Sequence, residues 1–386
     1  MVDYIVVGCG LCGMVIARHM ADKGKKVLII ERREHIGGNI YDYIDNNGVL
    51  VQKYGPHVFF TDNEEIEKYV NKYIDTEPLY AEYRTRIAGK NIPMPFNFKS
   101  IDMIYDTDTA EEIKKRLKKQ FGEREIVSVV DLVESNDEMI HNYGMYMYEH
   151  EYRLYTAKQW GRPIEEIDPS VFLRVPVYLS YKREYMKQKY QFMPVGGFTK
   201  FAEKLIDHPN ITVQLNTEAL NLIRLDEQSG EIYFKGEKLD IPLIYTGPID
   251  ELFSEKYGKL PYRALEFVWK TLPTESYMET ALAAFPEADK CIRVTEYTKF
   301  PPQKLEGKTV IAIEYPVEYD KSMPSGNEPY YPTLTESSKK INEKYQEEIV
   351  KFNNLYVCGR LGDFKYYNMD AIIERAFSIC NELEAR

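Results

Sequence analysis

The sequence YIVVGCGLCGMVIARHMADKGKKVLIIE at residues 4–31 decides the fold. Its first apolar run, within residues 3–8, is typical of a buried parallel strand, because it is continuous and ends in glycine. A helix is predicted from about Gly10 to Lys23, and the run KKVLIIE is predicted to be a second buried strand that ends at Glu31. Strand, glycine-rich turn, helix and strand in this order form a βαβ unit.

The turn of this unit carries the pattern Gly8-x-Gly10-x-x-Gly13. The glycines permit a tight turn and let a pyrophosphate approach the helix N-terminus, while the acidic Glu31 binds the adenosine ribose. The glycine pattern alone is weakly specific, but its context predicts a dinucleotide site. A further glycine pair at 37–38 favours FAD over NAD, with an ordinary loop as the alternative reading.

Composition and charge narrow the class of protein. The chain has 386 residues, of which 44% are hydrophobic and 29% charged, so we expect a globular protein of about two or three packed units. The net charge is −11 and no long basic run occurs, which argues against nucleic acid as a partner. The 32 tyrosines suit a polar, sugar-like ligand as well as a core.

The start of the chain, MVDYIVVGCG, reads as a strand and turn rather than a signal peptide, and no apolar run is long enough to span a bilayer. The five cysteines are an odd number, which fits a reducing compartment. We therefore expect a cytoplasmic protein without membrane insertion. Cys9-x-x-Cys12 lies inside the glycine turn, and no second such pair or close histidine pair accompanies it, so we expect no metal site.

Further segments suggest an α/β protein with insertions. Residues 100–160 are mostly helical in pattern, whereas residues 79–95 and 262–317 contain tyrosine-rich and β-branched runs that suit antiparallel strands. The run NNLYVCGR at 353–360 predicts a buried strand, and a helix with an apolar face follows it. A nucleotide domain that both begins and closes the chain implies insertions between its parts.

A series of motifs in this order is more specific: GCGLCG, ERREHIGGNIYDY, KYGPHVFFT, LYTAKQWG, YTGPID, EYP, EPYYP and GRLGDFKYYNMD. The series resembles the bacterial UDP-galactopyranose mutase family along the whole chain. The resemblance implies an isomerase that converts UDP-galactopyranose to UDP-galactofuranose, through attack of N5 of reduced FAD on the anomeric carbon. It also implies a nucleotide-sugar substrate, an external electron donor such as NAD(P)H, and a homodimer.

The resemblance implies a fold class as well: α/β, with an FAD-binding Rossmann-like domain, an inserted helical bundle and an antiparallel β-sheet domain. The expected boundaries are 1–78 plus 195–250 and 335–386 for the FAD-binding domain, 98–172 for the bundle, and 79–97 plus 173–194 and 255–334 for the sheet domain.

Site residues follow from the same resemblance. Arg174 and Arg293 match the arginines that clamp the substrate diphosphate, and His57 matches the histidine of a loop against the flavin. The substrate-binding set is Tyr152, Tyr155, Thr156, Trp160, Arg174, Tyr185, Arg293, Tyr331, Tyr366 and Phe60. The cofactor-binding set is Gly8, Gly10, Cys12, Gly13, Glu31, Arg32, Gly38, Asn39, Pro56, His57, Ala219, Thr246, Gly247, Arg360, Tyr367, Asn368, Met369 and Asp370.

Several positions depart from the family's pattern. Phe60 stands where a second histidine is usual, Ala283-Ala284 where an asparagine on the nucleotide side is usual, and Asn368 where an aspartate is usual. The sugar and nucleotide therefore stay open, with dTDP-fucopyranose and UDP-N-acetylgalactosamine as alternatives. A flavin oxidoreductase of the amine-oxidase kind shares the first motifs and is the rival class of function, whereas a non-catalytic nucleotide-binding module fits the arginine and aromatic matches poorly.

Overall fold

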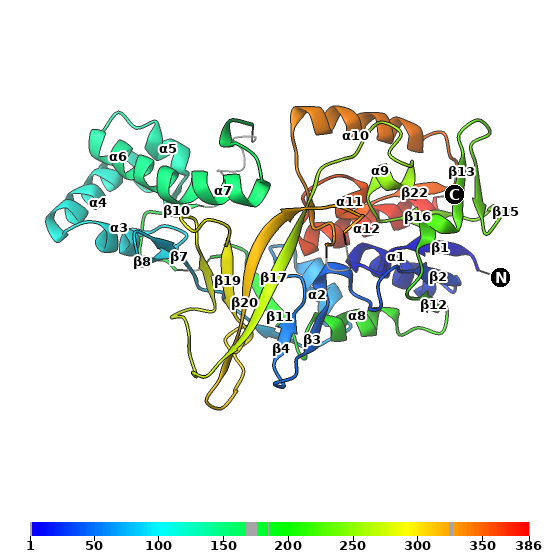
Figure 1. Cartoon of the computed structure of the whole chain (residues 1–386), viewed down its shortest axis with the longest axis horizontal. Coiled ribbons are helices and arrows are strands. Elements are labelled where there is room, and N and C mark those ends of the chain that lie inside the picture. The colour runs from blue at the N-terminus through cyan, green and yellow to red at the C-terminus, as the bar shows by residue number, and fades with distance from the viewer. Residues whose placement is uncertain (1, 167–175, 184, 324–326, 386) are drawn as a thin grey trace.

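A computed structural model describes residues 2–166, 176–183, 185–323 and 327–385 of the chain. Its centre is a five-stranded parallel sheet in the order β12-β2-β1-β16-β22 (Figure 1). The strands are β1 Tyr4–Val7, β2 Val27–Ile30, β12 Ile211–Gln214, β16 Leu243–Tyr245 and β22 Leu355–Val357. The predicted βαβ unit is β1, the helix α1 (Leu11–Asp22) and β2, which confirms the α/β class.

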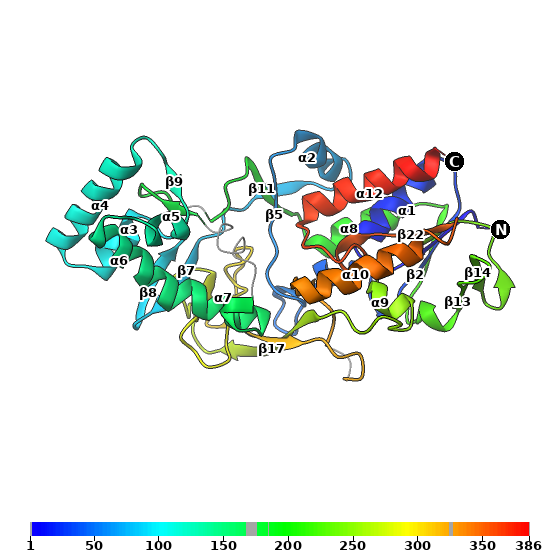
Figure 2. The same cartoon turned by 90° about the horizontal axis from the view of Figure 1, so that it is seen from above.

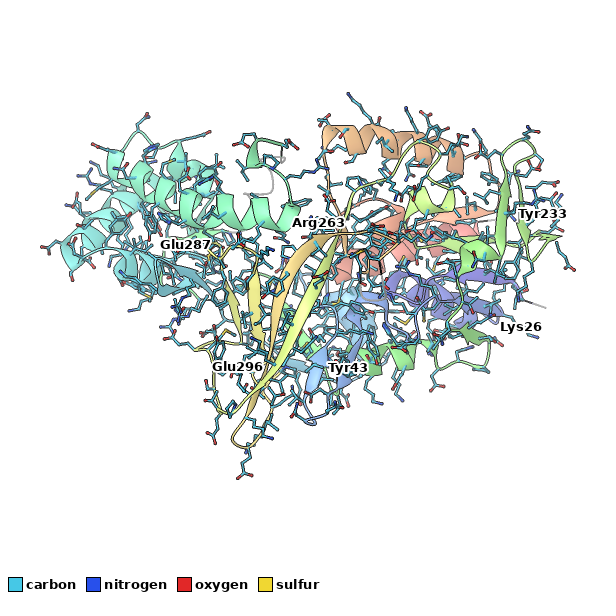
Figure 3. All side chains as sticks on the ribbon, in the orientation of Figure 1. Lys26, Tyr43, Tyr233, Arg263, Glu287 and Glu296 are labelled. Carbon is cyan, nitrogen blue, oxygen red and sulfur yellow. The ribbon has the colours of Figure 1, made fainter. Side chains whose placement is uncertain are left out.

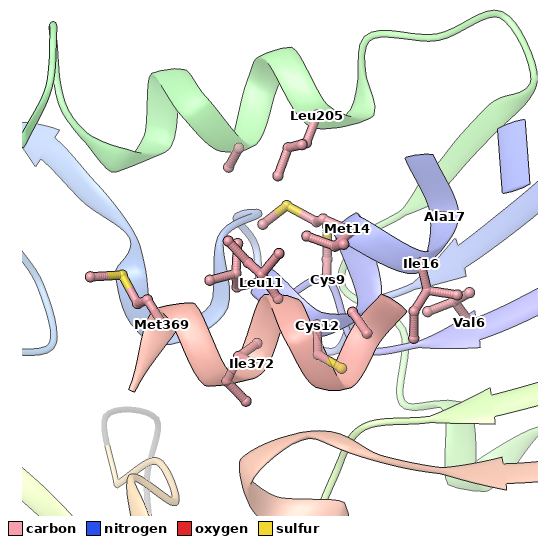
Figure 4. Packing of buried hydrophobic residues seen from close by; sticks show 14 of the residues in the cluster. Val6, Cys9, Leu11, Cys12, Met14, Ile16, Ala17, Leu205, Met369 and Ile372 are labelled. Atoms are coloured by element: carbon pink, nitrogen blue, oxygen red, sulfur yellow. The ribbon is translucent and has the colours of Figure 1, made fainter. Parts of the chain in front are cut away.

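Helices cover both faces of this sheet because the side chains of each strand alternate between the faces. Val6 of β1 packs on the side of α1, whereas Ile5 and Val7 pack on the opposite side. The first face carries α1, α8 (Phe198–Ile206) and α12 (Met369–Glu384). Figure 4 shows Leu11, Cys12 and Met14 of this core lying between Leu205 of α8 and Ile372 of α12. The second face carries α9 (Ile249–Leu252) and α10 (Glu336–Ile349).

A second, seven-stranded sheet has the order β21-β17-β20-β19-β18-β7-β8. Its strands are β7 Tyr83–Ile87, β8 Lys90–Met94, β17 Tyr262–Leu272, β18 Leu282–Ala284, β19 Arg293–Glu296, β20 Thr309–Glu318 and β21 Tyr331–Pro332. All its pairings are antiparallel except that of β7 with β18, which is parallel. The sheet is therefore mixed rather than purely antiparallel, since the distant β7 hairpin adds to the free edge of β18.

The helical part lies at the far end of the molecule from the parallel sheet, and the long strands β17 and β20 stand between the two (Figures 1 and 2). It contains α3 Phe98–Ile104, α4 Thr107–Phe121, α5 Val129–Val133, α6 Glu138–Met147, the π-helix η2 Tyr148–Tyr152 and α7 Arg153–Trp160. Ile113 and Leu117 of α4 are buried, as the helical spacing predicts. The elements α6, η2 and α7 follow one another without a break and so form a single helical run.

Short elements connect these parts. They are η1 Gly38–Ile40, β3 Asp42–Ile44, β4 Leu50–Gln52, β5 Phe59–Thr61, α2 Glu64–Asn71, β6 Thr76–Pro78, β9 Ile126–Val127, η3 Ile164–Glu166, β10 Val177–Tyr178, β11 Tyr190–Pro194, η5 Ala219–Asn221, β13 Ile223–Asp226, β14 Glu231–Phe234, β15 Glu237–Lys238 and α11 Gly359–Gly362. In the described part of 173–194, β11 pairs with β5 and β6, and β10 pairs with β9. These two strands thus lie outside the seven-stranded sheet. No helix among the described residues is both long and apolar enough to cross a membrane.

Candidate functional site

A cavity lies at the carboxyl edge of the parallel sheet. The ends of β1, β2 and β16 line it through Val7, Ile30 and Tyr245, and the start of α11 lines it through Gly359 and Arg360. Ligands of open α/β sheets bind outside the carboxyl ends of the strands, where helix N-termini also point. The cavity is therefore in the position of a dinucleotide site.

The glycines of the turn bring backbone segments into close contact. A Cβ atom on Gly13 would lie 2.1 Å from the carbonyl oxygen of Gly8, and one on Gly38 would lie 2.8 Å from the Cα of Gly10. The turn is held from the other side by Glu31, whose Oε2 accepts a hydrogen bond from the backbone N–H of Cys9 at 2.8 Å. The N-cap residue of α1, Gly10, has no side-chain capping bond, so the helix N-terminus can receive an anion.

Most residues of the predicted cofactor set line this cavity. The lining includes Gly8, Gly10, Cys12, Glu31, Arg32, Gly38, Asn39, His57, Ala219, Thr246, Gly247, Arg360 and Met369. The lining does not include Gly13, Pro56, Tyr367, Asn368 and Asp370. Gly13 instead lets α1 pack closely against β1. The backbone carbonyl of Tyr367 accepts a hydrogen bond from Arg360 Nη2 at 2.6 Å.

His57 lines the cavity. Its Nδ1 lies 2.7 Å from the carbonyl oxygen of Gly55, and its Nε2 lies 3.2 Å from the hydroxyl of Tyr330. A carbonyl oxygen only accepts, so Nδ1 carries the proton and Tyr330 donates to Nε2. Burial, followed by the charge of Arg360, lowers the pKa of His57 to about 4, which keeps the ring neutral at ordinary pH.

Arg293 lies on β19, beside the same loop. Its Nη2 is 2.7 Å from Oε2 of Glu314 and 3.0 Å from Oε1, and its Nε is 3.0 Å from Oε2. Burial opposes a charged guanidinium, but the neighbouring Glu314 raises the pKa of Arg293 well above its usual range. A Cβ atom on Gly55 would lie 3.7 Å from Arg293 Nη2, so this ion pair packs directly against the His57 loop.

Tyrosines surround the ion pair. Burial raises the pKa of Tyr185 to about 12 and that of Tyr330 to about 12, although the charge of Arg293 opposes both shifts. The pKa of Tyr155 is also raised by burial and opposed by Arg293. These hydroxyl groups therefore stay protonated and can donate hydrogen bonds to an anionic ligand.

A cluster of aromatic side chains joins α7 to the C-terminal segment. The ring of Tyr331 lies 5.6 Å from that of Trp160 and 6.0 Å from that of Tyr366, measured between centroids. The guanidinium of Arg360 lies 5.6 Å from the centroid of the Tyr366 ring and 5.7 Å from that of Tyr330. Arg360 therefore connects the dinucleotide cavity to the tyrosine cluster.

The remaining predicted substrate residues fall in different places. Arg174 lies outside the described residues. Tyr152 is buried in the helical part, where its ring centroid is 5.9 Å from that of Phe96. Phe60 is half-buried on β5, opposite Gln191 of β11, and does not line the cavity.

Two groups at this site, Tyr330 and Glu314, are not among the residues predicted from the sequence. Both lie inside motifs quoted above, EPYYP and EYP, but the resemblance assigns a substrate role only to Tyr331 of the first motif. Glu314 of β20 is the register partner of Arg293 on the neighbouring strand β19, and the two side chains form an ion pair. The signal that could have found it is an acidic residue at an inward position of an apolar strand, which requires a cationic partner. Among the described residues, no cluster of three or more metal-ligating side chains occurs.

Comparison with known proteins identifies the family. The sequence profile of UDP-galactopyranose mutase matches residues 151–366, and that of an NAD(P)-binding Rossmann-like domain matches residues 6–73. The chain is 30% identical to the UDP-galactopyranose mutase of Mycoplasma pneumoniae over 389 residues, which cover 99% of this chain and 96% of the relative. The chain belongs to the UDP-galactopyranose mutase family.

Other likenesses agree with this assignment. The chain is 30% identical to the dTDP-fucopyranose mutase of Escherichia coli over 385 residues, which cover 98% of this chain and 97% of the relative. A crystal structure of reduced UDP-galactopyranose mutase matches with a TM-score of 0.74 at 18% identity, over 100% of this chain and 96% of that one. Putrescine oxidase bound to putrescine matches with a TM-score of 0.59 at 11% identity, over 100% and 99%. At these identities the structural likeness shows the fold alone.

Membership of the UDP-galactopyranose mutase family makes the chain an enzyme of an isomerase family, with a Rossmann-like dinucleotide-binding domain. It also implies a nucleotide-sugar substrate. The family resemblance read from the motifs is thereby confirmed.

Proposed function

We propose that this enzyme interconverts the pyranose and furanose forms of a nucleotide sugar, UDP-galactopyranose and UDP-galactofuranose, with reduced FAD as its cofactor. One observation carries the proposal. Arg360, His57 and Tyr330 line the dinucleotide cavity, and they also lie among the tyrosines described above. A cofactor and a sugar nucleotide bound in these two places would meet at these three residues.

The cavity suits FAD. The N-terminus of α1 has no side-chain cap, and a Cβ atom on Gly10 would point into open space, which leaves room for a pyrophosphate. Glu31 already accepts two backbone N–H groups, and its two oxygens have further lone pairs for a ribose hydroxyl. When bound in its reduced form, FAD would supply the nucleophile for the anomeric carbon. We further propose an external donor such as NAD(P)H and a homodimeric assembly.

The residues of the chain would bind and orient the substrate. Arg293 and Arg174 would hold the diphosphate, with the hydroxyl groups of Tyr185, Tyr331 and Tyr366 around the diphosphate and sugar. Because Glu314 compensates the charge of Arg293, we expect Arg174 to supply the net positive charge. Tyr155, Thr156 and Trp160 on α7 would contact the uridine.

The direct test is incubation of the purified protein with UDP-galactofuranose or UDP-galactopyranose and dithionite, followed by chromatography of both ring forms. We expect a yellow protein with one FAD per chain that turns over only after reduction. Equal turnover by the air-oxidised enzyme would exclude catalysis by reduced flavin. Oxygen consumption with an amine substrate, and no change of ring size, would instead support the oxidoreductase reading.

A related substrate is the second candidate, because a dTDP-fucopyranose mutase is also 30% identical and Phe60 replaces a histidine of the family pattern. A phenyl ring offers neither a donor nor an acceptor to a sugar hydroxyl, so we expect broad rather than sharp specificity. Phe60→His should raise kcat/KM for UDP-galactose relative to deoxy and N-acetyl analogues. Unchanged ratios across a panel of UDP- and dTDP-sugars would make Phe60 a packing residue.

A further inference from the structure

Arg263 of β17 reaches the C-terminal end of α7 (Figure 3). Its Nε donates to the carbonyl oxygen of Gln159 at 2.9 Å, and its Nη2 lies 3.4 Å from that of Lys158. Arg263 is only 5% exposed, and no carboxylate of the described residues forms an ion pair with it. Two sources of negative charge compensate this buried cation: Glu318, its register partner on β20, whose charge raises the pKa of Arg263, and the carbonyl groups at the end of α7.

The helix can supply this compensation. The run α6, η2 and α7 extends from Glu138 to Trp160, and the last carbonyl groups of a helix carry partial negative charge. A guanidinium beside them donates to these carbonyl groups and neutralises the end of the dipole. Burial nevertheless lowers the pKa of Arg263, which shows that placing the cation here has a cost.

Gly161 makes the contact possible. It ends α7 with a left-handed backbone, φ 62° and ψ 30°, and a Cβ atom on it would lie 2.3 Å from Nη1 of Arg263. Any other residue would therefore meet the guanidinium as well as the strain of positive φ. The close approach of Arg263 explains why the last residue of the LYTAKQWG motif is a glycine.

A second group holds the same carbonyl. The hydroxyl of Tyr331 donates to the Gln159 oxygen at 3.1 Å, and Tyr331 is the register partner of Arg263 between β21 and β17. The Tyr331 ring also contacts the ring of Trp160. Two neighbouring strands thus fasten one backbone atom of α7, one residue before Trp160.

We propose that Arg263 is a positioning residue for the nucleotide end of the substrate: it docks the last turn of α7 onto the sheet and so places Tyr155, Thr156 and Trp160. It does not touch the ligand itself. The identity of that ligand rests on the proposed function, whereas the docking of α7 does not.

The chain has two tryptophans, so Trp269→Phe leaves Trp160 as the sole indole reporter. In this background we would compare Arg263→Gln, Arg263→Lys and Gly161→Ala, with Arg162→Gln as the control. Arg162 is an exposed neighbour that pairs loosely with Glu166 at 3.7 Å. Acrylamide quenching of Trp160, flavin content, and kcat and KM for UDP-galactose are the measurements.

We expect Arg263→Gln to expose Trp160 to acrylamide and to raise KM about tenfold, with kcat changed by less than about twofold and FAD retained, since a lost hydrogen bond to a charged group has an effect of this size. Arg263→Lys should restore part of the loss, because it keeps the charge without the planar fork. Gly161→Ala should act like Arg263→Gln, and the double variant should be no worse than either single variant.

Two outcomes would overturn the proposal: unchanged Trp160 quenching in both Arg263→Gln and Gly161→Ala, or a fall in kcat at constant KM, which would assign Arg263 to the chemistry. If no sugar nucleotide is turned over, the proposed function fails, but the quenching of Trp160 still tests the docking of α7. If Arg263→Gln does not fold, Arg263→Lys and Gly161→Ala provide the same readings.

Discussion

The hydroxyl of Tyr330 donates a hydrogen bond to Nε2 of His57 across 3.2 Å. The other ring nitrogen donates to the carbonyl oxygen of Gly55, so both nitrogens of the neutral ring have hydrogen-bond partners. The pair therefore fixes the tautomer of His57 beside the cofactor cavity, while burial and the charge of Arg360 keep the ring neutral.

Arg360→Gln should raise the pKa of His57 from about 4 towards its ordinary value, because after burial the charge of Arg360 is the largest of the effects that lower this pKa. NMR titration of the histidine Cε1–H signals would measure the shift. His35 is a matched internal control, since its Nδ1 lies 2.9 Å from the Ile36 carbonyl and its Nε2 lies 2.8 Å from the Tyr54 hydroxyl, and its pKa is also lowered to about 4. A His57 pKa that stays constant or falls would contradict the assigned effect of the Arg360 charge.

Glu151→Gln should stabilise the protein at high pH. Glu151 is 3% exposed, accepts a hydrogen bond from Thr85, and has its pKa raised by burial from 4.5 to about 8. Between these values the folded state binds more protons than the unfolded state, so the contribution of Glu151 to stability falls as pH rises from 4.5 to 8. A glutamine is always neutral and can still accept from Thr85.

Thermal unfolding of the parent and Glu151→Gln at pH 5, 7 and 9 would test this. The difference in Tm should be small at pH 5 and should grow in favour of the variant as the parent carboxyl ionises. A constant difference between the parent and Glu151→Gln across the pH range would show that Glu151 ionises near its ordinary pKa.

Two glycines of the turn should behave differently when a side chain is added. Gly13→Val should abolish FAD binding and lower Tm, because its side chain would meet the Gly8 carbonyl oxygen. Gly10→Val should fold with a smaller loss of Tm but still lose FAD, since among the described residues beyond its chain neighbours no atom lies within 4 Å of a Cβ there, and the residue lines the cavity. Flavin absorbance and Tm would be measured together. Full flavin content in Gly10→Val would place the pyrophosphate elsewhere.

Arg293→Ala should reduce kcat by about 10²–10³ if this group holds the charge that develops on the leaving diphosphate. It should also destabilise the fold by about 3–5 kcal/mol, since Glu314 would stay buried without its partner. The double variant Arg293→Gln, Glu314→Gln separates these effects, because it removes both charges and leaves no buried carboxylate without a partner. We expect the double variant to recover Tm but to keep a low activity. Near-parental activity would show that Arg293 does not bind the diphosphate.

Local patterns were enough to predict the βαβ unit and the helix at the end of the chain. A continuous apolar strand, a glycine turn and a helical apolar face are each encoded within about thirty residues, and each decides its own backbone conformation. Ile372, Ile373, Ala376 and Ile379 are accordingly buried on α12. The motif series also sufficed to predict the family, since its spacing extends along the whole chain.

Contacts between distant segments could not be predicted in this way. His57 meets Tyr330 across 273 positions, and Arg293 meets Glu314 through the register of β19 and β20. The parallel pairing of β7 with β18, and the contact of Arg263 with the end of α7, likewise depend on how strands from separate parts of the chain align. The sequence by itself determined which residue types and local elements were available. Only the tertiary structure decided which of them meet, because a strand's register and neighbours depend on long-range burial and hydrogen bonding that no local pattern encodes.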